Sequence, residues 1–77
     1  MAVFQRVKDL REDHDLNQVQ VGELLDISQH SYSRYETGKQ PFPIRHLITL
    51  ALFYKTSIDY LVGLTDDPTP PEHKRTK

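Results

Sequence analysis

The stretch LNQVQVGELLDISQHSYSRYETGK, residues 16–39, decides the fold. Asn17, with Gln20 three residues later, has the pattern of a capping box, which opens a helix about two turns long. Ser28 repeats the N-cap signal, and the helix that follows it ends near Gly38, because glycine suits a left-handed C-cap. Two short helices joined by so tight a break are typical of a helix-turn-helix.

The second of these helices, which we expect from Gln29 to about Thr37, has a distinct polar side. Helical spacing brings four polar residues together there: Gln29, His30, Ser33 and Arg34. Glutamine can bond adenine at N6 and N7, and arginine can bond guanine at O6 and N7, so this side suits the DNA major groove. The alternative is that the four residues merely face water. Taken alone, this helix favours the solvated interpretation.

Two further amphipathic helices flank the motif. Val3, Val7 and Leu10 recur at helical spacing before it and form one apolar stripe. After it, Pro43 stands where the first turn of a helix tolerates proline, and a strongly apolar helix follows over residues 44–52. The motif therefore has two neighbours against which it can pack.

The last expected helix is the short segment 58–62, which Ser57 caps and Gly63 closes. No run of alternating apolar and polar residues, the pattern of a β-strand, is longer than about four residues. We therefore expect residues 1–64 to form one all-α domain of five helices. Residues 65–77 contain prolines and a basic end without apolar anchors, and we expect them to be a flexible tail.

Composition excludes several classes of protein. Without cysteine, neither a disulfide framework nor a thiolate metal site is expected. We expect no cofactor and no catalysis, because the sequence offers neither a glycine-rich phosphate loop nor a credible nucleophile–base pair. With no apolar run long enough to span a bilayer and no signal pattern, we expect a cytoplasmic protein without membrane association. Four histidines lack close metal-ligand spacing: His14, His30, His46 and His73.

Charge is segregated along the chain, although the net charge is only −1. Residues 28–46 hold Arg34, Lys39 and Arg45 against a single carboxylate, a balance of about +2. Residues 9–26 hold six carboxylates against one arginine, a balance of about −5. This pattern excludes a chain that coats nucleic acid everywhere, but it permits a local, mildly basic surface with salt-dependent affinity.

Residues 16–39 resemble the helix-turn-helix of the Xre family, which includes phage Cro proteins and phage repressors. The resemblance extends from about Phe4 to Gly63, and it is carried by NQ opening one helix, by RYE-x-GK closing the next, and by S-x-D-Y-L near the end. It implies a compact, all-α five-helix bundle of the lambda-repressor-like DNA-binding type. It also implies a sequence-specific transcriptional regulator, expected to be a repressor.

The resemblance assigns parts to individual residues. Gln18 matches a residue that bonds a phosphate and supports the reading helix. The positions that approach bases or flanking phosphates are Ser28, Gln29, His30, Ser33 and Arg34. The positions that contact the DNA backbone are Asn17, Lys39, Gln40 and Arg45. For His30, reading a base, contacting a phosphate when protonated and simple hydration all stay open.

Arg11 and Glu36 stand where the family pairs its first and third helices by a salt bridge. Both fall near apolar stripes, so we expect a partly buried pair rather than two solvated charges. Removing one partner of such a pair is the costly change.

Other positions depart from the family. Asp15 and Asp26 occupy turn positions that commonly hold glycine, and we predict positive φ at both. Gly22 lies where we expect the two helices of the motif to approach closely. Tyr32 replaces a more usual aliphatic core residue, and its hydroxyl needs a partner or water.

One reading helix contacts too few base pairs to specify a site in a genome. We therefore expect a homodimer on a pseudo-palindromic double-stranded operator. Near the last helix, Tyr60, Leu61 and Leu64 can supply the dimer contacts; packing inside the monomer is the alternative. The rival hypothesis for the whole chain is a protein-interaction module, such as an antitoxin or an adaptor, built on the same fold.

Overall fold

The computed structural model describes residues 4–70 of the 77-residue chain. It contains five α-helices and, within that range, no strand. The helices are α1 (Gln5–Asp13), α2 (Gln18–Leu24), α3 (Gln29–Glu36), α4 (Ile44–Tyr54) and α5 (Ile58–Leu61). The predicted all-α architecture is confirmed. Val3, which we placed in the first apolar stripe, lies outside the described residues.

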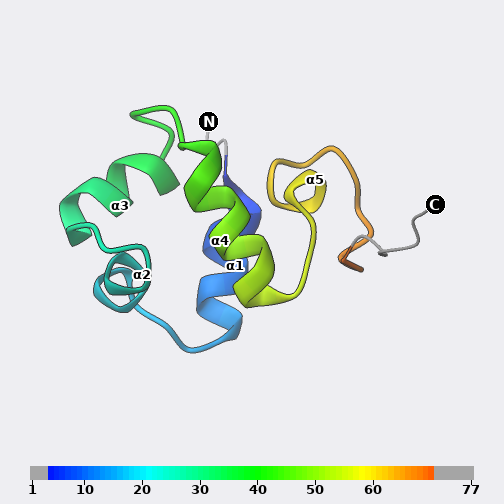
Figure 1. The fold of residues 1–77 in the computed structure, drawn as a ribbon, viewed down its shortest axis with the longest axis horizontal. Coiled ribbons are helices and arrows are strands. Elements are labelled where there is room, and N and C mark those ends of the chain that lie inside the picture. Colours follow the sequence, from blue (N-terminus) through cyan, green and yellow to red (C-terminus); the bar gives the residue numbers. More distant parts are fainter. Residues whose placement is uncertain (1–3, 71–77) are drawn as a thin grey trace.

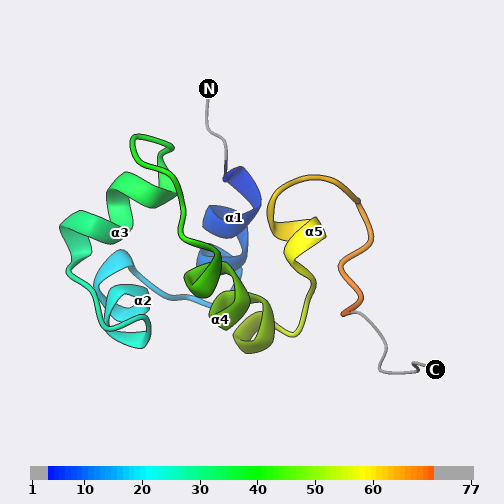
Figure 2. The same cartoon turned by 45° about the horizontal axis from the view of Figure 1, so that its top comes forward.

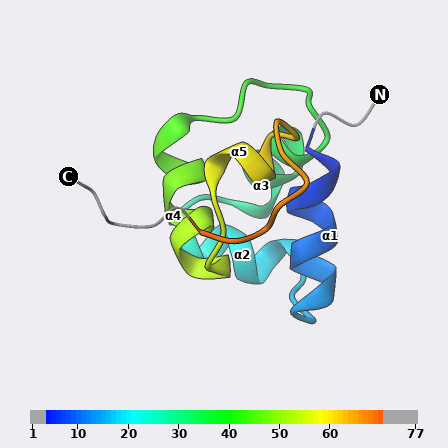
Figure 3. The same ribbon diagram turned by 90° about the vertical axis from the view of Figure 1, so that its right-hand side faces the viewer.

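The helices are arranged around α1 and α4 (Figure 1). The α2–α3 pair lies on one side of α4, and α5 lies on the other, an order that the tilted view keeps (Figure 2). Viewed from its α5 side, the molecule has α5 in front, with α1 and α4 to either side (Figure 3). The outer side of α3 therefore points away from α5.

Every helix contributes a side chain to a single core. The largest fully buried side chains are Val7, Val21, Tyr32, Leu50 and Leu61. Each such burial stabilises the fold by about 1.5–3 kcal/mol before conformational entropy is subtracted. Leu61, which we considered for a dimer surface, is only 1% exposed, so its apolar side chain serves the core instead.

Local capping signals give the helix starts. Asn17 Oδ1 accepts the Gln20 backbone N–H, and the Asn17 N–H donates to Gln20 Oε1, each at 2.8 Å, so the predicted capping box is confirmed. Ser28 and Ser57 cap α3 and α5 as predicted. Pro43 differs: it has an extended ψ of 140° and is the N-cap of α4 rather than a residue of its first turn.

The turns contain the expected left-handed residues. Asp15 and Asp26 have φ values of 57° and 60°, so both predictions are confirmed. Lys55, at the end of α4, has a φ of 58° that the sequence did not signal. A Cβ at Gly22 would lie 3.0 Å from the carbonyl oxygen of Ile27. The close approach that requires glycine is therefore between α2 and the turn, rather than between the two helices themselves.

Residues 65–70 do not behave as the free tail that we expected. The Arg6 guanidinium donates to the carbonyl of Thr65 and pairs with Asp66. The Thr56 hydroxyl donates to the carbonyl of Pro68 at 2.7 Å. These contacts hold the segment against α1 and the α4–α5 connection, whereas residues 71–77 lie outside the described part of the chain. Among residues 4–70, no helix is both long and apolar enough to cross a membrane.

Candidate nucleic-acid interface

The interface is built on a buried ion pair between α1 and α3. Arg11 Nε donates to Glu36 Oε2 at 2.9 Å, and Arg11 Nη2 donates to Glu36 Oε1 at 3.1 Å. The Arg11 side chain is only 11% exposed and the Glu36 side chain only 3%. This is the pair that the sequence led us to expect, and its two parallel hydrogen bonds fix the orientation of both groups.

Tyr32 completes the environment of the Glu36 carboxylate. Its hydroxyl donates to Glu36 Oε2 at 2.7 Å, which supplies the partner that a buried tyrosine needs. Burial raises the pKa of the Tyr32 hydroxyl, and the neighbouring carboxylate raises it further, so the proton stays on the tyrosine. Burial by itself would raise the pKa of Glu36, but the hydrogen bonds from Arg11, Tyr32 and Gln18 outweigh it and hold that pKa below its ordinary value. Glu36 is therefore an ionised carboxylate in the core.

Gln18 connects this buried carboxylate to the surface. Its Nε2 donates to Glu36 Oε1 at 3.2 Å, and its Oε1 accepts a long hydrogen bond of 3.4 Å from Gln29 Nε2. Arg11 supports the same corner by donating to the carbonyl of Leu16 at 3.0 Å. A continuous chain of hydrogen bonds thus leads from Glu36 through Gln18 to the first residue of α3.

The four polar residues expected on one side of α3 differ in exposure. Gln29 and His30 are exposed, whereas Ser33 and Arg34 are half-buried. The carbonyl of Ser33 accepts the Thr37 hydroxyl at 2.7 Å. On this side of α3 the first turn is therefore more accessible than the second, which suits a helix that enters a groove by its first turn.

Two of the predicted contact residues use part of their side chains for capping. Ser28 Oγ accepts the Ser31 N–H at 3.1 Å and lies 3.2 Å from the Ser31 hydroxyl, to which it donates. Asn17 Oδ1 is occupied by the capping box, which leaves the Asn17 amide N–H groups for an outside acceptor. Both residues are exposed, so these groups are accessible.

The loop after α3 folds back onto the end of that helix. The backbone N–H groups of Lys39 and Gln40 donate to the carbonyl of Arg34 at 2.9 Å and 3.2 Å. Both side chains are exposed, and so is that of Arg45 in the first turn of α4. The structure thus ties Lys39 and Gln40 to the C-terminal end of α3, while Arg45 comes from a neighbouring element.

Sequence reasoning missed one part of this surface. A hollow of about 330 Å³ lies between α1 and the α2–α3 pair, and its lining includes Lys8, Gln18 and Thr37. Lys8 is exposed and stands three residues before Arg11, on the same side of α1. That spacing was visible in the sequence, but only the packing of α1 against the helix-turn-helix places Lys8 and Gln18 on the same hollow.

These features define a helix-turn-helix domain with a polar, accessible second helix. A family profile described as helix-turn-helix matches residues 7–61, and the chain belongs to this family, in agreement with the Xre/Cro resemblance. Members of the family are DNA-binding proteins rather than enzymes, so the expectation of a non-catalytic chain is confirmed.

Two curated relatives extend the comparison. An uncharacterised HTH-type transcriptional regulator of Bacillus subtilis (strain 168), YobD, is 39% identical over 71 residues, which are 92% of this chain and 63% of the relative. The cryptic phage CTXphi transcriptional repressor RstR of Vibrio cholerae is 35% identical over 58 residues, which are 75% of this chain and 52% of the relative. The chain thus spans between about half and two thirds of each relative. No solved structure matches significantly.

Proposed function

We propose that this chain is a sequence-specific, double-stranded DNA-binding transcriptional repressor that reads the major groove with α3. Family membership and the named relatives, a transcriptional regulator and a phage repressor, support this function. We place the protein in the cytoplasm, where its DNA would be.

The observation that carries the proposal is the way Gln29 is held. Its side chain is exposed, yet its amide is hydrogen-bonded to Gln18, which is bonded in turn to the buried Glu36. A side chain that merely faced water would need no such support. A glutamine that must meet an adenine edge gains from it, because less conformational entropy is lost on binding.

The readers divide into two groups by chemistry. Gln29 and Arg34 would specify bases, with His30 and Ser33 beside them on α3, since these side chains can donate to base edges or accept from them. Phosphate contacts would position the domain without reading sequence. These contacts would come from Asn17, Gln18, Ser28, Lys39, Gln40 and Arg45, to which we add Lys8.

Dimerisation would supply the second half-site that one reading helix lacks. A homodimer can place two copies of α3 about one helical turn of DNA apart on a pseudo-palindromic operator. Two of the residues first considered for the dimer interface differ in exposure. Leu64 is 77% exposed, whereas Tyr60 is half-buried. The Arg6 guanidinium lies over the Tyr60 ring, 4.3 Å from the ring centre.

Fluorescence anisotropy titration tests the proposed function. The chain would be titrated against duplex DNA from upstream of its own gene and against a scrambled duplex of the same composition, each at 50 mM and 200 mM salt. We expect tighter binding to the upstream duplex at both salt levels, and weaker binding to both duplexes at the higher salt. Absence of DNA binding at low salt would instead favour the protein-interaction module.

A further inference from the structure

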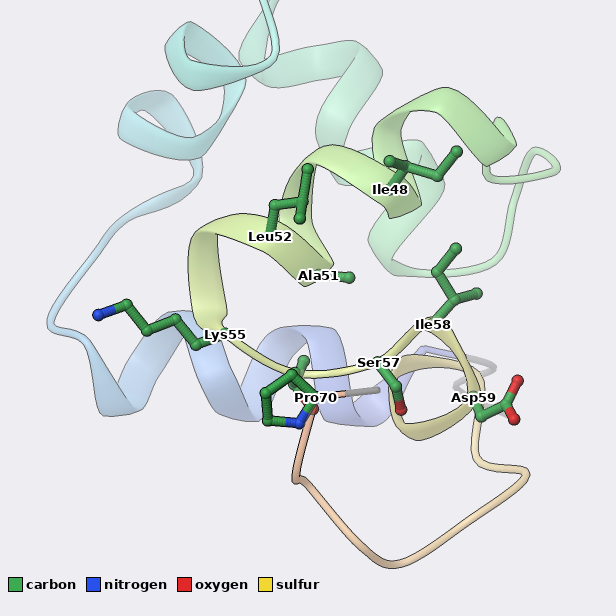
Figure 4. A pocket seen from close by; sticks show the side chains of 9 residues that line it. Ile48, Ala51, Leu52, Lys55, Ser57, Ile58, Asp59 and Pro70 are labelled. Atoms are coloured by element: carbon green, nitrogen blue, oxygen red, sulfur yellow. The ribbon is translucent and has the colours of Figure 1, made fainter. Parts of the chain in front are cut away.

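The hydrogen-bonded side chains around Glu36 lie on one side of the molecule. Arg11, Gln18 and Glu36 itself line the hollow between α1 and the α2–α3 pair. An apolar groove of about 560 Å³, between α4 and α5 and lined by residues such as Leu52, is on the α5 side instead (Figure 4). Within residues 4–70, no side chain that lines this groove takes part in the hydrogen bonds to Glu36. The polar connection to the proposed reading surface is therefore made by α1, α2 and α3.

The Glu36 carboxylate accepts four hydrogen bonds, two on each oxygen. Oε1 accepts Arg11 Nη2 at 3.1 Å and Gln18 Nε2 at 3.2 Å. Oε2 accepts Arg11 Nε at 2.9 Å and the Tyr32 hydroxyl at 2.7 Å. A carboxylate offers about four lone-pair sites, so every acceptor position of Glu36 is filled.

Tyr32 determines which of the two oxygens Gln18 can bind. Its hydroxyl makes the shortest of the four hydrogen bonds, and its side chain is fully buried, so water does not compete for the position. With both sites of Oε2 taken, the Gln18 amide has only Oε1 of Glu36 to bind. Tyr32→Phe would leave one site of Oε2 open, and the Gln18 amide could then bind either oxygen.

The outer end of this connection is sensitive to where Gln18 binds. The hydrogen bond from Gln29 Nε2 to Gln18 Oε1 is 3.4 Å long, at the long end of the range in which such bonds form. A shift of the Gln18 amide from one Glu36 oxygen to the other therefore breaks the contact with Gln29. Gln29 is exposed, so without that contact its side chain regains the rotamer freedom of any surface glutamine.

We propose that Tyr32 is a positioning residue for DNA reading. Its hydroxyl occupies Oε2 of Glu36, directs Gln18 to Oε1 and thereby holds Gln29 in the orientation that meets an adenine edge. Tyr32 itself is buried and does not touch DNA. The Xre resemblance leads us to expect an aliphatic residue at this position, so the device belongs to this chain rather than to the general motif. The inference rests on the proposed function, because it gives Tyr32 a part in the same readout.

The ratio of affinities for the upstream and the scrambled duplex tests this role. Fluorescence anisotropy at low salt would measure the ratio for the wild type, Tyr32→Phe and Tyr54→Phe, at a temperature where circular dichroism shows all three to be folded. We expect Tyr32→Phe to lower the ratio about threefold to tenfold, because Gln29 must then be ordered on binding. Affinity for the scrambled duplex should change less, since it does not depend on base readout.

Tyr54→Phe is the matched control. The Tyr54 hydroxyl is also buried, but it has no hydrogen-bond partner among residues 4–70. Its removal should leave the ratio unchanged. A merely structural role for Tyr32 would lower stability and both affinities together, without changing their ratio.

A Gln18→Ala background shows whether Tyr32 acts through Gln18. In that background Tyr32→Phe should lower the ratio no further, because the connection to Gln29 is already broken. A measurement on the wild type without DNA does not depend on whether Tyr32→Phe folds. By NMR, the side-chain amide protons of Gln18 should exchange with solvent more slowly than those of Gln40, which is exposed.

Four results would overturn the inference: an unchanged ratio in Tyr32→Phe, an equal fall in Tyr54→Phe, a further fall in the Gln18→Ala background, or a Gln18 amide that exchanges as fast as that of Gln40. Each of them leaves the proposed function intact as long as the wild type prefers the upstream duplex. A wild type without that preference would refute the proposed function, and the inference with it.

Discussion

Glu36 accepts hydrogen bonds from side chains of three helices, so this one carboxylate links α1, α2 and α3. Its carboxylate accepts hydrogen bonds from Arg11 of α1, Gln18 of α2 and Tyr32 of α3. The Arg11–Glu36 pair was predictable through the family resemblance, and Tyr32 lies four residues before Glu36, so their contact follows from helical spacing. The resemblance also predicted that Gln18 supports the reading helix, but its hydrogen bond to Glu36 carried no such signal, because that contact arises only when α2 packs against α3.

Replacing Glu36 should therefore be unusually costly. We predict that Glu36→Gln destabilises the fold by about 3 kcal/mol, since it leaves the Arg11 guanidinium buried without a counter-charge. Glu23→Gln, at an exposed carboxylate, should change stability by less than about 0.5 kcal/mol. Chemical denaturation at neutral pH measures the free energy of unfolding of both variants. Equal destabilisation by Glu36→Gln and Glu23→Gln would refute the role of the Arg11–Glu36 pair.

The pH dependence of this difference has a definite sign. The pKa of Glu36 is lowered from its ordinary 4.5, so the ionised form stabilises the folded state above that value. The stabilisation is lost as the pH falls through the folded-state pKa. The difference in the free energy of unfolding between the wild type and Glu36→Gln should therefore decrease at acidic pH.

At the scale of the elements, local chemistry explains the helices better than it explains the ends of the domain. Caps such as Asn17 and Ser57 act within a few residues of their own position, so the sequence predicts them well. The packing of residues 65–70 was missed because the groups that hold it there include the backbone carbonyls of Thr65 and Pro68, which every residue type possesses. The φ of Lys55 was missed because lysine gives no turn signal.

The helix α4 contains a second titratable group in the core, His46. The side chain is 6% exposed, and its Nε2 has no hydrogen-bond partner among residues 4–70. Burial lowers the pKa of His46 below its ordinary 6.5, and the nearby Arg45 charge lowers it further. The unfolded chain therefore binds a proton more readily than the folded one, and stability must fall as the pH drops below 6.5.

We predict that His46→Leu removes part of this acid sensitivity. The melting temperature of the wild type should decrease from pH 7 to pH 5.5 by more than that of His46→Leu, because leucine has no proton to bind. His30→Gln is the matched control, since His30 is exposed and its replacement should leave the wild-type slope unchanged. An equal decrease in melting temperature from pH 7 to pH 5.5 for the wild type and His46→Leu would show that His46 does not couple folding to pH.

At the scale of the whole molecule, the structure separates two surfaces. The α3 side presents Gln29, and the α4–α5 side presents the apolar groove around Leu52. The fold class could be predicted, because helix signals are local and the motif is specific, whereas the reading residues stay a prediction. The groove could not, since it depends on how α5 and residues 65–70 pack against α4. Leu61, for which packing inside the monomer was the alternative to a dimer contact, is in the core.

The most direct test of the account is the ratio of affinities for the cognate and the scrambled duplex in the variant Gln29→Ala/Arg34→Ala. We predict that the ratio falls to about one, because base readout is lost. Affinity for the scrambled duplex should change much less, since all of the proposed phosphate contacts remain, and circular dichroism should show an intact fold. A variant that keeps the wild-type ratio would show that α3 does not read the operator through these two side chains.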